Sequence, residues 1–447
     1  MTEALDDVLA RLDERGDELA ALASRLVRIP TVNPPGATRD LVAALDEHFR
    51  ARGIPTAVHE PVASKPSLCA TVPGRGEGKL IWLGHIDVVP PGKEEAWERD
   101  PFSGEIAGDR VYGRGTTDMK GGDAAAMVVA GLLHEMGNRL GPTVEFWFTC
   151  DEEVGGTDGA RKLAEAGLFA ADACIIGDGW TGATPTVDIG CKGGMGTTLR
   201  ARGRAGHASR PMAKDNAIDK LLAVIPHARR IGEVRLELPE DLYEVARFSG
   251  DDLAENSGLE GADAEMARNL FLYPSVALTM INGGVKTNVI PDEATANFDI
   301  RLTPGSDREK VRERMLALVA EAGLPDVTAE IRPSLAGSAG YYEPPGHPFV
   351  LHMRDAVRRA TGIMPALRLL SGGTDGISTH HISRIPSVGF GAGSAGGGAH
   401  APNEFVKIAD LVRAAKVYAT AALTFTRTSA REPPTPNPSP FKGRGTG

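Results

Sequence analysis

Cysteine and long apolar runs are scarce in this chain of 447 residues. Its four cysteines, Cys69, Cys150, Cys174 and Cys191, stand far apart and form no CxxC pair. We therefore expect free thiols in a reducing compartment rather than a disulfide framework. The sequence has no stretch of about 18 apolar residues that would predict a membrane span. The first residues also lack the basic and apolar regions of a signal peptide, so we expect a cytoplasmic protein.

Positively charged residues are also few: the chain has 49 Lys and Arg but 59 Asp and Glu, so its formal net charge is −10. A nucleic-acid-binding protein needs a basic face, so we expect neither a nucleic-acid partner nor a membrane partner. The sequence contains no GxSxG elbow of a serine hydrolase, no Walker-type GxxxxGK[ST] loop and no credible dinucleotide fingerprint. Hydrophobic residues nevertheless make up 42% of the chain, which is typical of a globular protein.

Helical and strand-like segments alternate through the first part of the chain. Apolar runs predict strands over residues 68–72, 80–83, 144–149 and 173–176, and helices over 40–52 and 122–136. Such alternation predicts an α/β catalytic domain with a mixed, mainly parallel sheet covered by helices.

The pattern changes near residue 193. Strands are expected over 197–204, 275–281 and 294–302, and helices over 216–229, 308–322 and 408–426. The alternation of apolar and polar residues in 294–302 suits a sheet with one wet face. We predict four regions: the catalytic domain over 1–192 and 305–428, an inserted smaller α+β domain over 193–304, and a disordered Pro-rich tail over 429–447.

The segment LIWLGHIDVVPPG runs an apolar strand directly into His85 and Asp87. Alternation along a strand points both side chains the same way. A carboxylate beside a histidine can accept its second ring N–H and orient it as a metal ligand. A capping Asp beside a surface His explains this segment alone equally well.

Further acids and a histidine follow other apolar segments, at Asp118 in VYGRGTTDMKGG, at Asp151, Glu152 and Glu153 after VEFWFTC, at Asp178 after ACIIG and at His400 in GGGAHAPNEF. Asp118 also suits a helix N-cap, and the three adjacent acids also suit a solvated turn. In an open α/β sheet, however, ligands bind at the carboxyl ends of the strands. Adjacent acids at a buried strand end need a positive partner, which a metal cluster would supply.

Two imidazoles and three carboxylates are available in His85, Asp118, Glu153, Asp178 and His400. This set suits zinc, with cobalt or manganese as alternatives, better than calcium, which prefers oxygen alone. Two divalent ions about 3.5–4 Å apart, bridged by one carboxylate, could share these ligands. Glu152 would remain as a base.

Six motifs carry a resemblance to a known family: GHIDVVPPG, WERDPFSGEIAGDRVYGRGTTDMKGG, DEEVGG, GRAGHASRP, NVIPDEATANFDIR and HAPNEF. They occur in the order seen in the acetylornithine deacetylase and succinyl-diaminopimelate desuccinylase family of dinuclear zinc metallopeptidases. Aminoacylases and glutamate carboxypeptidases are relatives of that family. The resemblance covers about residues 20–428.

The resemblance implies a role for each matched residue of the metal centre. Asp118 would bridge two metals, His85 and Asp178 would complete one, and Glu153 and His400 the other. Asp87 would orient His85, and Glu152 would be the general base that deprotonates the water bridging the two metals. Many family members carry Glu at the position of Asp178, so its shorter side chain is a departure.

The same resemblance implies that the inserted domain is a ferredoxin-like lid and dimerisation domain. In dimeric relatives the residue matching His207 crosses to the partner's site and stabilises the oxyanion. Asn288 and Arg301 match positions that hold substrate, and the segment LLSGGTDGIS, with Gly372, Gly373, Thr374 and Asp375, matches a substrate-contacting loop. A solvated loop histidine, a solvent-facing strand arginine and a plain turn are the alternatives for these positions.

We therefore expect a homodimeric, metal-dependent hydrolase that cleaves the amide bond of a small N-acyl amino acid, of deacetylase or desuccinylase type. A dipeptidase or carboxypeptidase of the same family, acting on a short peptide, is the alternative. A binding protein that has lost its chemistry is disfavoured, because the candidate ligands and Glu152 are all present.

Overall fold

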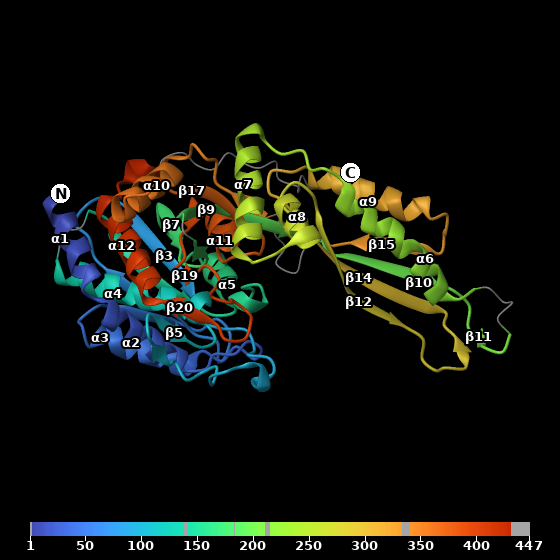
Figure 1. The fold of residues 1–447 in the computed structure, drawn as a ribbon, viewed down its shortest axis with the longest axis horizontal. Helices are drawn as coiled ribbons and strands as arrows, with labels where there is room; N and C mark the ends of the chain where they lie inside the picture. Colours follow the sequence, from blue (N-terminus) through green and yellow to red (C-terminus); the bar gives the residue numbers. More distant parts are fainter. Residues whose placement is uncertain (1, 138–140, 183, 211–214, 333–339, 431–447) are drawn as a thin grey trace.

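The computed structural model describes residues 2–137, 141–182, 184–210, 215–332 and 340–430. The chain forms a large unit, which contains the N-terminus, and a narrower small unit that extends from one side of it (Figure 1). The small unit is built from residues 195–238 and 275–332, and the large unit from the rest. Within the described ranges, no helix is long and apolar enough to cross a membrane.

The large unit is organised around a mixed sheet with strand order β1-β2-β6-β3-β7-β18-β9. Its strands are β1 (Thr56–His59), β2 (Ser67–Val72), β3 (Lys79–His85), β6 (Thr143–Thr149), β7 (Ala173–Ile176), β9 (Thr186–Gly194) and β18 (Ser387–Gly389), with β16 (Gly340–Tyr342) and β17 (Ala366–Leu370) also paired to β9. The neighbours β6, β3, β7 and β18 are parallel, whereas β1 and β2 join antiparallel at the edge. The predicted α/β fold class is confirmed.

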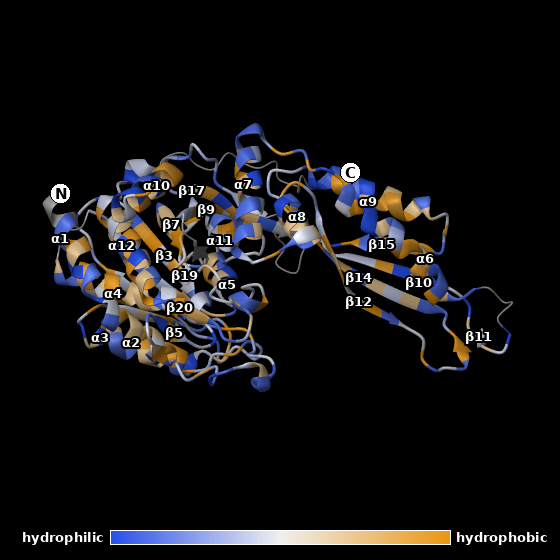
Figure 2. Cartoon of the chain, in the orientation of Figure 1, coloured by the Kyte–Doolittle hydropathy of each residue, from blue (hydrophilic) through white to orange (hydrophobic). Residues whose placement is uncertain are grey.

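Helices cover both faces of this sheet because its strands are apolar on both sides, as the colours of β3 and β7 show in Figure 2. Leu80 and Trp82 of β3 belong to the core under α4 (Gly121–Glu135), α10 (Pro348–Thr361) and α12 (Ile408–Thr424). Ile81 and Leu83 face the opposite core, which α5 (Ala160–Glu165) covers. The large unit also contains α1 (Thr2–Asp13), α2 (Gly16–Val27), α3 (Arg39–Arg50) and the short α11 (Gly376–Ser378).

The small unit has the chain order β-α-β-β-α-β: β10 (Thr197–Arg202), α6 (Ala217–Arg229), β12 (Ser275–Gly283), β14 (Glu293–Leu302), α9 (Arg308–Glu321) and β15 (Val327–Ile331). Its antiparallel sheet has the order β15-β10-β14-β12. This is the arrangement of a ferredoxin-like unit. The alternate residues of β14 expected to be apolar, from Ala294 to Ile300, are buried in the core with α6 and α9.

The small unit does not follow the predicted boundaries 193–304. Both α9 and β15 lie beyond residue 304 but pack in its core, so the unit continues to about residue 332. Conversely, α7 (Glu240–Asn256) and α8 (Gly261–Asn269) lie inside the predicted insert, yet Leu242 and Val245 of α7 join the large unit's core. An amphipathic helix shows that it has a buried face but not which core buries it. From residue 431 onward the predicted tail lies outside the described residues.

Short strands complete the fold. A three-stranded sheet joins β20 (Phe405–Lys407), β5 (Arg110–Tyr112) and β4 (Ile106–Ala107), and two-stranded pairs join β19 (Gly393–Ser394) to β8 (Trp180–Thr181) and β11 (Gly206–His207) to β13 (Val289–Ile290). The pairing of β20 with β5 brings the loop that carries His400 beside the loop that carries Asp118.

Candidate metal centre

The five predicted ligands meet at the carboxyl ends of three parallel strands. His85 ends β3, Glu153 follows β6 and Asp178 follows β7. Asp118 lies in the turn η2 (Thr116–Lys120) before α4, and His400 lies between β19 and β20. Because β6, β3 and β7 are adjacent and parallel, the chain leaves all three strands at the same edge of the sheet.

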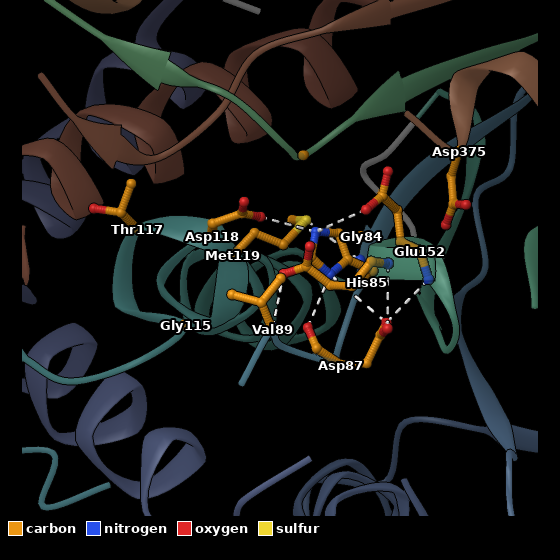
Figure 3. Close-up of polar contacts among 12 residues, drawn as sticks. Gly84, His85, Asp87, Val89, Gly115, Thr117, Asp118, Met119, Glu152 and Asp375 are labelled. Carbon is orange, nitrogen blue, oxygen red and sulfur yellow. Dashed lines mark hydrogen bonds and ion pairs between the residues drawn. The ribbon is translucent and has the colours of Figure 1, made fainter. Parts of the chain in front are cut away.

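Two groups of metal-ligating atoms share Asp118. One group is His85, Asp118 and Asp178, the other is Asp118, Glu153 and His400, and within each group the ligand atoms lie within 4.8 Å of one another. The two carboxylate oxygens of Asp118 face different histidines: Oδ1 is 3.0 Å from His85 Nε2 and Oδ2 is 3.1 Å from His400 Nε2 (Figure 3 for His85). His400 Nε2 is also 3.1 Å from Glu153 Oε2. This geometry matches a carboxylate that bridges two cations.

The electrostatics of these ligands also fit divalent cations. Burial lowers the pKa of His85, but the hydrogen bond with Asp118 and the charges of the surrounding acids raise it well above its ordinary value. Hydrogen bonds to Asp118 and Glu153 raise the pKa of His400 to about 10. Burial and the charge of Asp118 raise the pKa of Asp178 to about 7. Neighbouring negative charges therefore contribute to all three pKa shifts. Bound cations would neutralise these negative charges.

Glu152 lies beside the two groups without belonging to either. Its Oε2 is 4.0 Å from His85 Nε2, and its side chain points toward the same space as Asp118 (Figure 3). Burial, together with the charges of Asp178 and Asp375, raises the pKa of Glu152 well above its ordinary value. A carboxyl group that readily takes up a proton is suited to general acid–base work.

Asp87 supports this region differently from the prediction. Nδ1 of His85 lies 3.0 Å from the backbone oxygen of Asp87, whereas the nearest carboxylate oxygen of Asp87 is 3.8 Å away. The carboxylate instead accepts backbone N–H groups of Glu152, at 3.1 Å, and Glu153, at 3.3 Å. The alternation that predicted a carboxylate–imidazole contact does not continue, because β3 ends at His85. Asp87 thus positions the acidic turn as well as His85.

A cavity of about 730 Å³ lies between the two units and opens onto the metal centre. Glu152, Glu153 and His400 line its large-unit side, and the predicted substrate residues Arg301, Gly373 and Thr374 line it as well. The guanidinium of Arg301 pairs with Asp299, with Nε 2.9 Å from Oδ1 and Nη2 3.0 Å from Oδ2.

His207 and Asn288 do not reach this cavity. Both are exposed: His207 ends β11 and Asn288 directly precedes β13, at the end of the small unit that points away from the large unit (Figure 1). Nδ1 of His207 lies 2.7 Å from Oγ of Ser209 and 3.2 Å from the backbone nitrogen of Ser209. Within one chain, the structure does not bring these two residues to the metal centre.

Of three further residues near the centre, Asn33 and Glu404 were not assigned from the sequence, and Asp375 was assigned only to the substrate-contacting loop. Asn33 donates through Nδ2 to Asp87 at 2.8 Å, Asp375 accepts from Thr149 Oγ1 at 2.7 Å, and the buried Glu404 accepts from backbone N–H groups of the Asp118 turn. Burial raises the pKa of Asp375 to about 7. Glu404 stands in the motif HAPNEF and Asp375 in LLSGGTDGIS, but neither motif tells which of its polar residues turns inward.

Comparisons with known proteins agree with this geometry. The family model described as peptidase family M20/M25/M40 matches residues 81–424. A succinyl-diaminopimelate desuccinylase of Methylorubrum extorquens is 30% identical over 415 residues, which are 89% of this chain and 96% of that protein.

Solved structures share the fold. An M20 family metallo-carboxypeptidase from Sulfolobus solfataricus superposes with a TM-score of 0.73 at 21% identity, covering 91% of this chain and 99% of the other. A dinuclear metal-binding peptidase of the M20 family from Bacillus subtilis has a TM-score of 0.62 at 17% identity, covering 92% and 98%. The chain belongs to peptidase family M20/M25/M40 and is a metal-dependent hydrolase of amide bonds.

Proposed function

We propose that this chain removes an acyl group from an N-acyl amino acid, with an N-succinyl amino acid as the first candidate and an N-acetyl amino acid as the second. The observation that carries the proposal is the position of Asp118 between two ligand groups, with Glu152 beside them. The name of the desuccinylase relative supports the choice of acyl group.

Two divalent metal ions fit the two ligand groups, and zinc is the first choice because imidazole and carboxylate donors are mixed. Cobalt and manganese share these ligands and remain alternatives. When bound, such ions polarise a carbonyl oxygen and lower the pKa of water.

The chain's own residues would divide the remaining chemistry. Glu152 would accept a proton from the attacking water and return it to the leaving amine nitrogen, which completes the cleavage of the C–N bond. Asp87 would hold the turn that carries Glu152 through the backbone N–H group of that residue.

The charge of the cavity supports an acyl group with a second carboxylate. Arg161, Lys192, Arg301 and Arg332 line the cavity, together with four acids: Glu152, Glu153, Asp375 and the Asp299 that pairs with Arg301. A succinyl-amino acid brings at least two carboxylates, whereas an acetyl-amino acid brings one. Arginine binds carboxylates with paired hydrogen bonds, so the additional charge is expected to strengthen binding.

We also propose that the chain works as a cytoplasmic homodimer in which His207 completes the partner's site. The support is the exposed position of His207 and the resemblance described above. The small unit would provide the contact, either through its edge strand β12 or through its helices.

The test is hydrolysis by metal-free protein and by protein reconstituted with zinc or cobalt. The panel would contain matched N-succinyl- and N-acetyl-amino acids and several dipeptides, with release of free amine as the measurement. Metal-dependent turnover of the succinyl compounds with the highest kcat/KM supports the proposal. Higher kcat/KM on dipeptides would instead favour a dipeptidase or carboxypeptidase. The metallo-carboxypeptidase from Sulfolobus solfataricus shares the fold of this chain.

A further inference from the structure

A single buried carboxylate ties together the two loops that carry Asp118 and His400. Glu404 is 0% exposed and follows His400 by four positions. Its Oε1 accepts the backbone N–H groups of Thr117, at 2.9 Å, and Asp118, at 3.1 Å, and its Oε2 accepts that of Gly115 at 3.0 Å. Three contacts on one turn fix the direction of the backbone from which the Asp118 side chain projects.

The charge of Glu404 is balanced within the same cluster. Arg114, which is 1% exposed, donates through Nη1 to Oε2 of Glu404. The backbone also joins the two loops. Gly113 N–H donates to the backbone carbonyl oxygen of Glu404 at 2.9 Å, and Thr117 Oγ1 donates to the backbone carbonyl oxygen of Phe405 at 2.6 Å. A fully buried carboxylate is tolerated only with such complete pairing.

We propose that Glu404 is a positioning residue that holds Asp118 and His400 at the separation needed for two metal ions. Asp118 must present its two oxygens in different directions, toward His85 and toward His400. Since Glu404 binds the Asp118 turn and belongs to the His400 loop, it sets the position of both with one side chain. This inference rests on the metal centre of the proposed function.

The chemistry of the contacts requires a carboxylate. Four donors converge on Glu404, and a carboxylate has only acceptors to offer them. In Glu404→Gln, the amide NH₂ would face donors in place of one oxygen, so that part of the cluster would open. Partners of metal ligands typically contribute 10–100-fold to metal affinity. We expect Glu404→Gln to weaken binding of at least one ion by about tenfold or more.

The test is a Co²⁺ titration of the full chain, followed by the visible absorption of the bound ion and by calorimetry. Wild-type protein is expected to bind two ions, and Glu404→Gln is expected to bind one of them at least about tenfold more weakly with an altered spectrum. Glu145→Gln is the matched control, because Glu145 pairs with Lys79 at 2.7 Å near the opposite ends of the strands. Its spectrum and both affinities should equal those of the wild type.

A second variant separates positioning from folding. Glu404→Gln leaves the buried Arg114 without its charge partner, which can destabilise the fold by itself. The double variant Arg114→Gln/Glu404→Gln removes both charges, so we expect it to recover thermal stability in the metal-free state while Co²⁺ binding stays weak. If either folded variant binds two Co²⁺ ions with wild-type affinity and spectrum, Glu404 does not position the ligands. If wild-type protein itself binds no Co²⁺, the proposed metal function fails instead.

Discussion

The strand ends of the large unit and the β11–β13 tip of the small unit differ in how completely one chain builds them. At the strand ends, His85 is 2% exposed, and the ligand groups are joined through both oxygens of Asp118. At the tip, His207 and Asn288 are exposed, and neither lines the cavity between the units. A cluster of charges that is largely buried, apart from the exposed His400, is a product of intrachain packing, whereas an exposed side chain at the end of an extended unit is available to a second molecule. The comparison predicts that variants in the two regions behave differently when chains are mixed.

Replacing Asp118, the ligand that both groups share, should have the largest effect. This variant tests the metal centre at the strand ends. Asp118→Asn keeps the size of the side chain but removes the negative charge that both ligand groups use. We expect loss of both metal ions and of measurable turnover, as determined by elemental analysis and amine release. Asp307→Asn, at the N-cap of α9 in the small unit, is the control and should retain both ions. Two bound ions in Asp118→Asn would contradict the shared-ligand assignment.

The next largest effect is expected from the proposed base. Glu152→Gln should lower kcat by about 10²–10⁴-fold, the usual contribution of general acid–base catalysis, while metal content stays at the wild-type level. Glu145→Gln, with the same chemical change remote from the centre, should leave kcat unaltered. Retention of wild-type kcat by Glu152→Gln would remove Glu152 from the mechanism. Together with Asp118→Asn, this variant separates metal binding from proton transfer.

The contrast between the two regions also shows what a sequence can and cannot predict. His85, Glu153 and Asp178 were predicted together because parallel strands deliver their carboxyl ends to one edge of a sheet, whereas Asp118 and His400 joined them through ligand chemistry and the family resemblance. That argument needs only the type and order of the elements. The structure confirms the α/β class. It also places possible ligand atoms of the five residues in two groups that share Asp118, and their role as metal ligands stays a prediction.

Contacts that depend on exact packing were not predictable in the same way. The carboxylate of Asp87 turns to the backbone of the acidic turn because β3 ends before the alternation reaches Asp87. Glu404 is one of several polar residues in its motif, and only the pairing of β20 with β5 shows that it faces the Asp118 turn. Likewise, Val311, Met315 and Leu318 give α9 an apolar stripe, but its sequence does not say that this stripe packs in one core with α6 and β15.

The third prediction tests the tip. His207→Ala should lower kcat by about 10²–10³-fold, as expected for loss of one oxyanion donor, with metal content unchanged. Co-expression of His207→Ala and Glu152→Gln chains should recover activity, because a mixed dimer contains one site with both residues intact. Each variant alone should stay impaired. Failure of mixed dimers to recover activity would show that His207 does not act across subunits.

The smallest effect is expected at Arg301, on the wall of the cavity between the two units. Arg301→Lys keeps the positive charge but loses the paired donors that suit a carboxylate, so KM should rise by roughly tenfold with little change in kcat. Arg312→Lys is the matched control, since Arg312 pairs through Nε with both oxygens of Glu309 on α9, at 2.8 and 2.9 Å, outside the cavity lining. The rise in KM should be larger for succinyl- than for acetyl-amino acids if the additional carboxylate lies near Arg301. Equal KM values for wild type and Arg301→Lys would mean that Arg301 serves only to pair with Asp299, and the substrate carboxylate would then have to be held by another cation of the cavity.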